Sequence, residues 1–303
     1  MKDICVLMST FNGEKYLREQ IDSILNQKDV KVHLLVRDDG STDKTIEILA
    51  EYQQKSLLRF YIGNNIKPAH SFIELVHKAE DFDFYAFADQ DDYWYENKLI
   101  RAIECLKEYT TQKKEAIYIS ALEIVDKNLL HIENSVNQNA KFTIEESFIE
   151  SPAVGCTMVF NKYMRKRIID KNTQDIEIAM HDSWIYRVGI SIGAKIIYDK
   201  KGYIKYRQHE NNTIGVKKEK NVINQTKNLF SKRRKYKGKV AQNILNLYNN
   251  EIIENNRKAL QLITQLDNSS LIYKFKIIFN KKFRSNSKKM NIKFYYDIIR
   301  NRI

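Results

Sequence analysis

The sequence has few cysteines, few prolines and no long apolar run. Its three cysteines (Cys5, Cys105 and Cys156) are far apart and odd in number. They form no disulfide framework and no CxxC pair, which favours a reduced, cytoplasmic setting. No stretch of about 18 apolar residues is present, so we expect no membrane span. The N-terminus also lacks the pattern of a signal peptide. Two prolines and 43% hydrophobic residues are typical of an ordered globular protein.

The net charge of +13 is distributed unevenly. Residues 217–303 contain 22 Lys and Arg against 5 Asp and Glu, so this segment carries +17 and residues 1–216 carry −4. We place a boundary near 216–220, between a mildly acidic body (1–216) and a basic, mainly helical C-terminal region (217–303). Basic residues mixed with Phe, Tyr and Ile suit an anionic membrane surface. Packing on the body or in a homo-oligomer stays open, and no nucleic-acid-binding motif is present.

Strand-like and helix-like segments alternate along the first 110 residues. Strands are expected in "DICVLM" (3–8) and at 58–63 and 84–89. Helices are expected within 9–27 and at 71–79 and 96–109. Residues 32–53 are expected to form a strand, a polar turn and a helix, in that order. This alternation predicts an α/β fold with a mostly parallel, Rossmann-like sheet.

The second half is less regular. It predicts strands at 116–126, 153–161, 194–199 and 203–209, and a helix at 181–193.

Three polar clusters follow predicted strands. They are "STFN" (9–12), "RDDGS" (37–41) and "DQDD" (89–92). Ligands of open α/β sheets gather at the carboxyl ends of the strands. The sequence therefore predicts that these clusters share one site.

The DQDD cluster fits a divalent-cation site. Ionised carboxylates at Asp89, Asp91 and Asp92 repel one another unless a positive charge lies among them. Mg²⁺ and Mn²⁺ take oxygen ligands, usually one or two carboxylates plus substrate phosphates. The alternative is that Asp91 or Asp92 caps the helix that follows. The position at a predicted strand end favours the metal site.

The first two clusters are candidates for a nucleoside site. A carboxylate of Asp38 or Asp39 can accept a hydrogen bond from a pyrimidine base or a ribose hydroxyl, and Thr10 or Phe11 can lie against the base. Alternatively, Asp38 and Asp39 belong to a turn in which Gly40 supplies a permissive backbone.

Together, in this order and spacing, the motifs "VLMSTFNGEKYLREQ", "LLVRDDGSTDKT" and "FYAFADQDDYWYENKL" resemble the N-terminal half of family 2 glycosyltransferases. The resemblance is close over residues 3–110 and looser to about 215. It implies a GT-A fold with a nucleotide-sugar half (1–110) and an acceptor half (111–216), and inverting transfer from a nucleotide diphosphate sugar.

The resemblance also implies roles for the motif residues. The nucleoside would be held by Thr10, Phe11, Asn12, Asp38 and Asp39. Asp91 would bind Mn²⁺ or Mg²⁺ directly, with Asp89 on the metal and donor and Asp92 in support.

An inverting transfer needs a carboxylate that takes the proton of the acceptor hydroxyl. The family places this base at the start of a helix, and "AMHDSWIYR" offers Asp182. His181 stands where an acidic neighbour is commoner, and Trp184 is a further supporting candidate. The alternative makes Asp182 a helix N-cap and Trp184 a core residue.

The segment "YIKYRQHENNTIG" matches a Tyr-Arg-x-His pattern that closes over the diphosphate in several family members. It implies that Arg207 contacts phosphate and that His209 is a metal ligand. Cys156, in "SPAVGCTMVFN", is interpreted as a small packed residue.

Among subgroups, the sequence most resembles bacterial rhamnosyltransferases that build capsules and O-antigens. These use dTDP-L-rhamnose and a lipid-linked or polysaccharide acceptor, on the cytoplasmic face of the membrane. A UDP-sugar donor is the alternative. A nucleotidyltransferase would need a phosphate-binding loop that "STFNGEKYL" does not supply, and a basic membrane-binding module is the non-enzymatic alternative.

Overall fold

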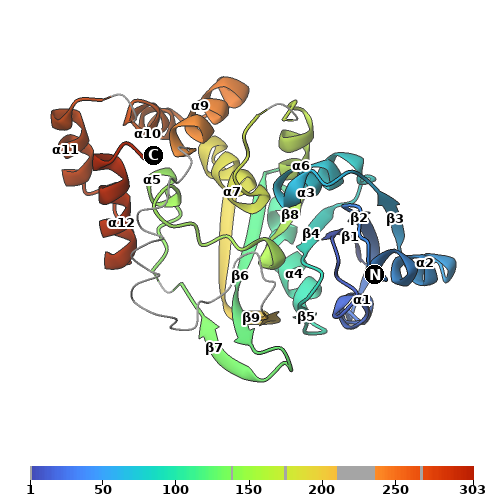
Figure 1. Ribbon diagram of the computed structural model, residues 1–303. Helices are drawn as coiled ribbons and strands as arrows, with labels where there is room; N and C mark the ends of the chain where they lie inside the picture. Colours follow the sequence, from blue (N-terminus) through green and yellow to red (C-terminus); the bar gives the residue numbers. More distant parts are fainter. Residues whose placement is uncertain (1, 138, 174–175, 210–235, 267–268) are drawn as a thin grey trace.

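The computed structural model describes residues 2–137, 139–173, 176–209, 236–266 and 269–303. Figure 1 shows helices packed on both faces of a curled sheet. The first strands are β1 (Lys2–Thr10), β2 (Val30–Asp38), β3 (Arg59–Ile62), β4 (Phe84–Ala88) and the short β5 (Tyr93–Trp94). The helices among them are α1 (Leu17–Leu25), α2 (Thr45–Gln54), α3 (Lys67–Lys78) and α4 (Lys98–Thr111).

The described residues between 116 and 207 add four strands: β6 (Ala116–Val125), β7 (His131–Ser135), β8 (Val159–Asn161) and β9 (Lys195–Arg207). Its helices are α5 (Ile144–Ser147), the 3₁₀ helix η1 (Gly155–Thr157), α6 (Lys162–Ile169) and α7 (His181–Ile192). The C-terminal region forms α9 (Lys237–Tyr248), α10 (Glu254–Thr264), α11 (Leu271–Phe279) and α12 (Lys288–Ile299).

The strands form one sheet in the order β3-β2-β1-β4-β8-β6-β9-β5, with β7 paired to β6. In the described part of the chain, only the short β5, β7 and β8 run against the direction of the other strands. The predicted α/β fold with a mostly parallel sheet is therefore confirmed.

Alternate side chains of β1 belong to two hydrophobic cores, one on each face of the sheet. Ile4, Val6 and Met8 pack under α1, α2 and α4, whereas Cys5 and Leu7 face the core shared with α3, α6 and α7. A strand buried on both faces is an apolar run, which is why β1 is readable from the sequence.

The register of the first strands aligns their carboxyl ends. Thr10 of β1 pairs with Asp38 of β2, and Met8 pairs with Ala88 of β4. The three polar clusters that follow these strands therefore lie along one edge of the sheet, as the sequence predicts.

Two strand predictions are wrong in detail. The strands expected at 194–199 and 203–209 are one strand, β9, because a bulge after Asp199 absorbs two residues and lets pairing with β6 continue. The strand expected at 153–161 is reduced to β8. The residues before it form η1, whose first backbone N–H, that of Gly155, bonds to a side chain in α7 instead of a strand.

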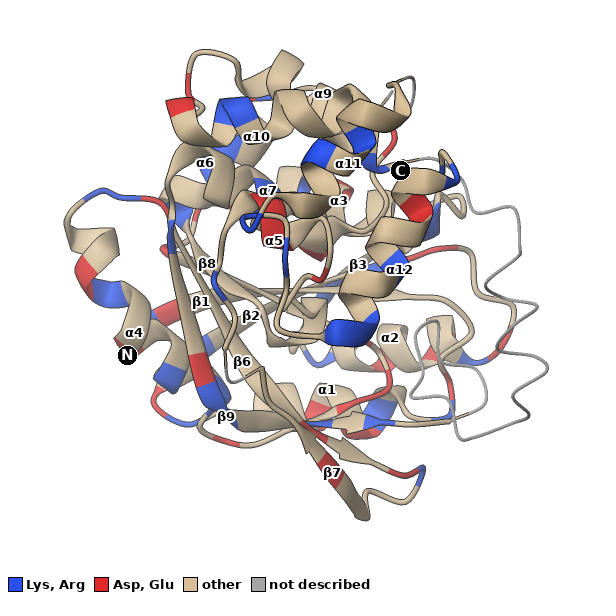
Figure 2. Ribbon diagram, turned by 90° about the vertical axis from the view of Figure 1, so that its left-hand side faces the viewer, with Lys and Arg blue, Asp and Glu red and all other residues tan. Residues whose placement is uncertain are grey.

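The C-terminal helices share a hydrophobic core with α7 and the sheet. Val240 and Tyr248 of α9 and Ile263 of α10 belong to the same buried cluster as Trp184 of α7. Figure 2 shows Lys and Arg distributed over this region. The boundary proposed near 216–220 lies outside the described residues. Within the described ranges, no helix is both long enough and apolar enough for a membrane crossing.

Candidate active site

The DQDD segment forms a loop at the carboxyl edge of the sheet. Asp89 directly follows β4, and the chain re-enters the sheet at β5. The end of β9 lies beside this loop. Asp92 Oδ1 accepts a 3.1 Å hydrogen bond from the backbone N–H of Arg207, and His209 Nε2 lies 2.8 Å from Asp91 Oδ2. The fold thus brings the acidic loop and the "YRQH" segment together.

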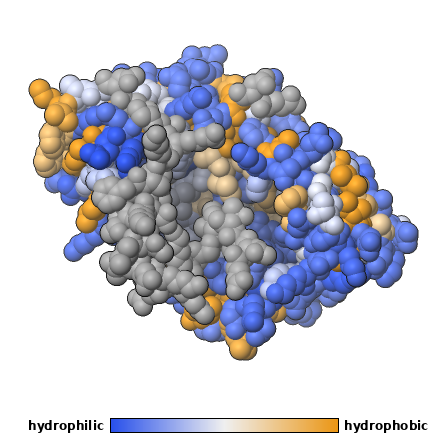
Figure 3. Space-filling model, viewed as in Figure 1, coloured by the Kyte–Doolittle hydropathy of each residue, from blue (hydrophilic) through white to orange (hydrophobic). Residues whose placement is uncertain are grey.

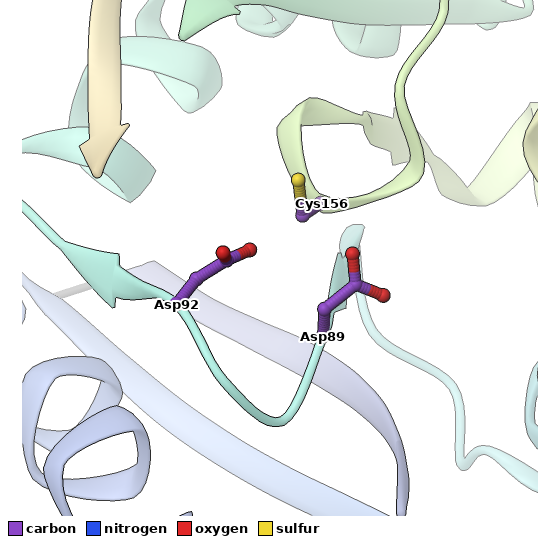
Figure 4. A group of neighbouring side chains, drawn as sticks. All are labelled: Asp89, Asp92 and Cys156. Carbon is purple, nitrogen blue, oxygen red and sulfur yellow. The ribbon is translucent and has the colours of Figure 1, made fainter. Parts of the chain in front are cut away.

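Asp89, Asp92 and Cys156 point toward one another from two segments of the chain (Figure 4). One carboxylate oxygen of Asp89, one of Asp92 and the thiol sulfur of Cys156 all lie within 4.8 Å of one another. Burial, together with the neighbouring Asp91 charge, raises the pKa of Asp89 and of Asp92 above the ordinary range. Burial also raises the pKa of the Cys156 thiol. A positive charge placed here would relieve the repulsion among the carboxylates.

The donor atoms fit a hard divalent cation. Asp92 Oδ2 is buried and has no hydrogen-bond partner among the described residues, and such an acceptor calls for a cation or a proton. Mg²⁺ and Mn²⁺ prefer oxygen ligands. Asp89, Asp91 and Asp92 would therefore hold the ion, with the imidazole of His209 next to Asp91. The protonated thiol of Cys156 is a poor ligand for such an ion.

A buried lysine, which the sequence analysis did not single out, lies close to this group. Lys98 begins α4, and its Nζ lies 3.7 Å from the centroid of the Trp94 ring. Burial lowers the pKa of Lys98 to about 7, against the attraction of Asp92 and Cys156. The Lys98 side chain is therefore a buried source of positive charge within electrostatic reach of the Asp92 carboxylate.

Asp182 lies in the first turn of α7, beside η1. The Gly155 N–H donates a 2.9 Å hydrogen bond to Asp182 Oδ2, and the Ser183 N–H donates to Oδ1. The N-cap of α7 is Met180, which makes no side-chain capping bond. The charge of Asp182 contributes to the raised pKa of Asp89. The proposed base is therefore held rigidly, within electrostatic reach of the acidic loop.

The two aromatic side chains near Asp182 in α7 are buried. The His181 ring stacks on Phe72 at 3.9 Å between centroids and meets Phe87 edge-on at 4.7 Å. Burial lowers the pKa of His181 to about 4, so the ring is neutral at pH 7. Trp184 is in the core, 6.5 Å from the Tyr248 ring of α9. Both side chains fix the start of α7.

Replacing Gly155 by alanine is expected to disturb the base. The added Cβ would lie 2.7 Å from His181 Nε2 and 3.6 Å from Asp182 Oδ2, and the stacked His181 ring has little room to move. A displacement of the base by about 1 Å costs roughly 100-fold in rate. We expect that loss in donor hydrolysis, measured as release of the nucleotide diphosphate.

Gly189→Ala is the matched control. Its Cβ would also meet an atom at 2.7 Å, Cδ1 of Ile117, but in the core behind α7. Both variants should lower the melting temperature. If Gly189→Ala lost as much activity as Gly155→Ala, general destabilisation would explain the result and the contact with Asp182 would not.

The "STFN" and "RDDGS" segments are tied to each other. Thr10 Oγ1 donates a 2.8 Å hydrogen bond to Asp38 Oδ2, and the Ser41 N–H donates to Asp38 Oδ1 at 2.8 Å. Asn12 Oδ1 accepts a 2.8 Å hydrogen bond from the Thr42 N–H. The buried carboxylate of Asp38 therefore holds the two loops together.

Asp39 and Phe11 differ in their surroundings. Both carboxylate oxygens of Asp39 accept from Ser71 Oγ, at 2.8 and 2.6 Å, and Arg37 forms an ion pair with it. The Phe11 ring is 45% exposed at the end of β1 and offers an aromatic face to a base. The nucleoside contacts inferred from the sequence for Thr10, Phe11, Asn12, Asp38 and Asp39 stay predictions.

Gln90 connects the acidic loop to the segment that follows β1, a contact that was not expected from the sequence. Its Oε1 accepts from the Phe11 N–H at 2.9 Å, and its Nε2 donates to the Phe11 carbonyl at 3.1 Å. Gly13 makes room for this contact, since a Cβ there would lie 2.3 Å from Gln90 Oε1. The signal in the sequence was an amide between two aspartates, opposite a glycine that follows the first strand.

Gln90→Ala is expected to weaken donor binding. It removes both hydrogen bonds that hold the Phe11 backbone to the acidic loop, each worth about 1 kcal/mol, so the donor dissociation constant should rise by up to about 30-fold. Calorimetry measures this change. Gln112→Ala is the control. The exposed side-chain amide of Gln112, just after α4, donates a 2.9 Å hydrogen bond to Glu108 in that helix, far along the chain from the acidic loop. Unchanged donor affinity in Gln90→Ala would remove Gln90 from the donor site.

Arg207 is held by protein groups. Its guanidinium donates to the backbone carbonyls of Asp91 at 2.8 Å and of Lys127 at 2.7 Å, and forms an ion pair with Glu19. It also lies over the Tyr16 ring, 4.4 Å from its centroid. These contacts make Arg207 a positioning residue for the acidic loop, and its contact with phosphate stays a prediction.

The arrangement offers two carboxylate groups with different tasks. The acidic loop can hold a cation and a diphosphate, and Asp182 can accept a proton across from it. Such a pair suits the displacement of a nucleotide diphosphate by a hydroxyl group.

Comparison with known proteins agrees with this chemistry. Residues 5–173 match the family model described as Glycosyl transferase family 2. Over 222 residues the chain is 32% identical to the dTDP-rhamnosyl transferase RfbG of Shigella flexneri. This alignment covers 69% of this chain and 73% of that protein.

Two solved structures share the fold. Staphylococcus aureus TarS 1–349 in complex with UDP-GlcNAc has a TM-score of 0.62 at 18% identity, covering 100% of this chain and 82% of that one. The mannosyltransferase PcManGT from Pyrobaculum calidifontis, in complex with GDP-Man and Mn²⁺, has a TM-score of 0.54 at 14% identity, covering 98% and 86%. With a family match over more than half of its length, the chain belongs to glycosyl transferase family 2 and is a glycosyltransferase.

Proposed function

We propose that the enzyme transfers L-rhamnose from dTDP-L-rhamnose, with inversion, to a lipid-linked or polysaccharide acceptor in the synthesis of a cell-surface polysaccharide. One observation carries the reaction type. The Asp182 carboxylate, fixed by the Gly155 N–H at 2.9 Å, is close enough to the acidic loop to raise the pKa of Asp89. This arrangement supports a base and a diphosphate site at one edge of the sheet.

The residues divide the displacement between them. An acceptor hydroxyl oxygen attacks the anomeric carbon, the bond from that carbon to the diphosphate oxygen breaks, and the nucleotide diphosphate leaves with the electron pair. Asp182 takes the proton of the hydroxyl as the new bond forms. Gly155 and the stacked His181 keep Asp182 in place. A divalent ion bound by Asp89, Asp91 and Asp92 would supply the positive charge that the departing diphosphate needs.

The donor is inferred from the relatives. The protein named dTDP-rhamnosyl transferase matches 69% of this chain at 32% identity, which supports dTDP-L-rhamnose. A UDP-sugar is the second candidate, because TarS 1–349 shares the fold and was solved with UDP-GlcNAc. The non-enzymatic binding module suggested by the basic tail loses its support, since the chain belongs to a family of enzymes.

A polar cavity supports a saccharide acceptor. A cavity of about 470 Å³ opens between β6, the segment before η1 and the start of α12. Its polar lining includes Ser120, whose buried hydroxyl has no partner among the described residues, and Glu146 and Glu150. Val154 lines the cavity and is covalently joined to Gly155, which holds the base. The hydroxyl and carboxylate groups of this lining suit the binding of a sugar.

The donor is identified by calorimetry with and without Mn²⁺ or Mg²⁺. The panel contains dTDP-rhamnose, UDP-glucose, UDP-galactose, UDP-N-acetylglucosamine and GDP-mannose. We expect metal-dependent binding with dTDP-rhamnose the tightest, by about tenfold or more, as one good pocket contact allows. A preference for a UDP-sugar would keep the enzyme class and discard rhamnose. Absence of binding by any donor would overturn the proposal.

A further inference from the structure

Helix α11 exposes an apolar stripe to solvent. Ile272, Phe275 and Phe279 are spaced three and four residues apart, so they lie on one face, and they are 83%, 47% and 72% exposed. The Phe275 and Phe279 rings stack with their centroids 6.2 Å apart. The opposite face, with Ile277 and Lys274, is buried. Apolar residues therefore lie on both the buried and the exposed side of the helix, and packing among the described residues does not explain the exposed ones.

Helix α12, which packs against α11, adds to this surface. Ile292 and Ile299 are 68% and 46% exposed and lie two turns apart. Figure 3 shows hydrophobic residues gathered at the edge of the molecule where α11 lies in Figure 1. Exposed apolar side chains that cluster in this way mark an interaction site more often than scattered ones do. We call the five side chains on these two helices the α11–α12 surface.

The same segment is strongly basic. Residues 271–303 contain ten Lys and Arg and a single acidic residue, Asp297, which is buried. The exposed basic residues cluster at the end of α11, in the loop after it and at the start of α12; they include Lys276, Lys281, Lys282, Arg284, Lys288 and Lys289. Apolar and cationic groups therefore share one end of the molecule.

We propose that the α11–α12 surface docks on an anionic lipid bilayer. Ile272, Phe275 and Phe279 would enter the boundary between headgroups and acyl chains, and the surrounding Lys and Arg would lie among lipid phosphates. This inference rests on the proposed function, because the lipid-linked acceptor is part of that proposal.

The position of the surface fits that acceptor. Asn286 and Ser287, in the loop between α11 and α12, line the polar cavity proposed for the acceptor. Asn286 Nδ2 donates to the Asn139 carbonyl, and Lys141 Nζ donates to the Arg284 carbonyl at 3.2 Å. This loop is therefore attached to the segment between β7 and α5. A bilayer on α11 and α12 would hold lipid-linked saccharides next to the cavity.

The charge favours a bilayer over other occupants. A second copy placed symmetrically on this face would bring like charges together, which opposes association. Nucleic acid would be attracted by the Lys and Arg and could stack bases on Phe279, but it offers no comparable partner to the aliphatic side chains of Ile272 and Ile292. An anionic bilayer satisfies both groups at once.

Vesicle sedimentation with the full chain tests the inference. The probes are vesicles of phosphatidylcholine alone and of phosphatidylcholine mixed with phosphatidylglycerol. Wild type should bind the anionic vesicles, bind the neutral ones at least about tenfold less, and lose affinity with added salt. The double variant Ile272→Ser, Phe279→Ser should bind the anionic vesicles at least about tenfold more weakly.

Leu130→Ser, Ile132→Ser is the matched double variant. These two side chains, beside and within β7, are 65% and 50% exposed and lie outside the α11–α12 surface. It should bind vesicles as wild type does. Donor hydrolysis without vesicles should be equal in all three proteins, so a failed bilayer inference stays distinguishable from a failed proposed function.

Four results would overturn the inference. Wild type does not bind anionic vesicles, or the α11 variant binds them as well as wild type does. Alternatively, sedimentation velocity shows a wild-type dimer that the α11 variant abolishes, which would assign the surface to a second copy. Finally, wild type binds a labelled RNA more tightly than anionic vesicles, and removing the basic charge alone abolishes that binding. This result would assign the surface to nucleic acid.

Discussion

Replacing Asp182 by asparagine is expected to reduce donor hydrolysis and sugar transfer by about 100- to 10,000-fold, the usual contribution of a general base. The amide keeps the shape of the carboxylate, and its oxygen can still accept from the Gly155 N–H. It cannot take a proton from the attacking hydroxyl. Donor affinity should stay within about twofold of wild type, because the base acts on the acceptor and not on the nucleotide.

Asp297→Asn is the control for this variant. Asp297 in α12 is 7% exposed and Asp182 is 8% exposed, so both substitutions neutralise an equally buried carboxylate. Asp297→Asn should retain activity. The rate is followed by release of the nucleotide diphosphate and the affinity by calorimetry. A parallel loss of rate and donor affinity in Asp182→Asn would assign Asp182 to the donor site instead.

Replacing Asp91 by asparagine is expected to remove most of the metal dependence of donor binding. Asp91 is the carboxylate of the acidic loop that lies 2.8 Å from His209 Nε2, so the change removes a charge and disturbs this pair. Loss of a supporting group alone lowers metal affinity by about 10- to 100-fold, and loss of a direct ligand should reach at least the upper figure. Titration with Mn²⁺, without donor and with it, measures the effect.

Asp83→Asn is the matched control. Asp83 lies just before β4, at the opposite end of the strand from Asp89. There it forms a surface ion pair with Lys162 at 2.7 Å. It should bind Mn²⁺ as wild type does. If Asp91→Asn also kept wild-type Mn²⁺ affinity, the ion would have to be held by Asp89 and Asp92 without Asp91.

The first half of the fold could be predicted because each local signal was unambiguous. β1 and β4 are apolar runs buried on both faces, and each ends at a polar cluster. Parallel strands place such ends along one edge, so the convergence of Thr10, Asp38 and Asp89 followed from the pattern. The family match over residues 5–173 confirms the resemblance on which the activity was inferred.

The second half was harder because long-range contacts override the local pattern there. The two lysines after Asp199 look like a turn, yet they form a bulge in one strand. The apolar segment before β8 looks like a strand, but its Gly155 N–H bonds to Asp182, 27 residues further on. Neither contact has a signature in the neighbouring residues.

Side-chain partnerships in the site were the least predictable. Cys156 was interpreted as a small packed residue, and packing does place it, but next to Asp89 and Asp92. Arg207 was expected at phosphate, whereas its described contacts position the acidic loop. Gln90 was overlooked because an amide between aspartates has no distinctive spacing. Composition predicted the basic helical tail, but not the exposed apolar stripe on α11.

The most direct test is release of nucleotide diphosphate from dTDP-rhamnose by wild-type protein, with water as the acceptor, in Mn²⁺ or Mg²⁺ and in a chelator. The site described here predicts slow release that requires the metal and disappears in Asp182→Asn. Release that persists in the chelator, or that Asp182→Asn leaves unchanged, would contradict a metal-assisted transfer with Asp182 as the base.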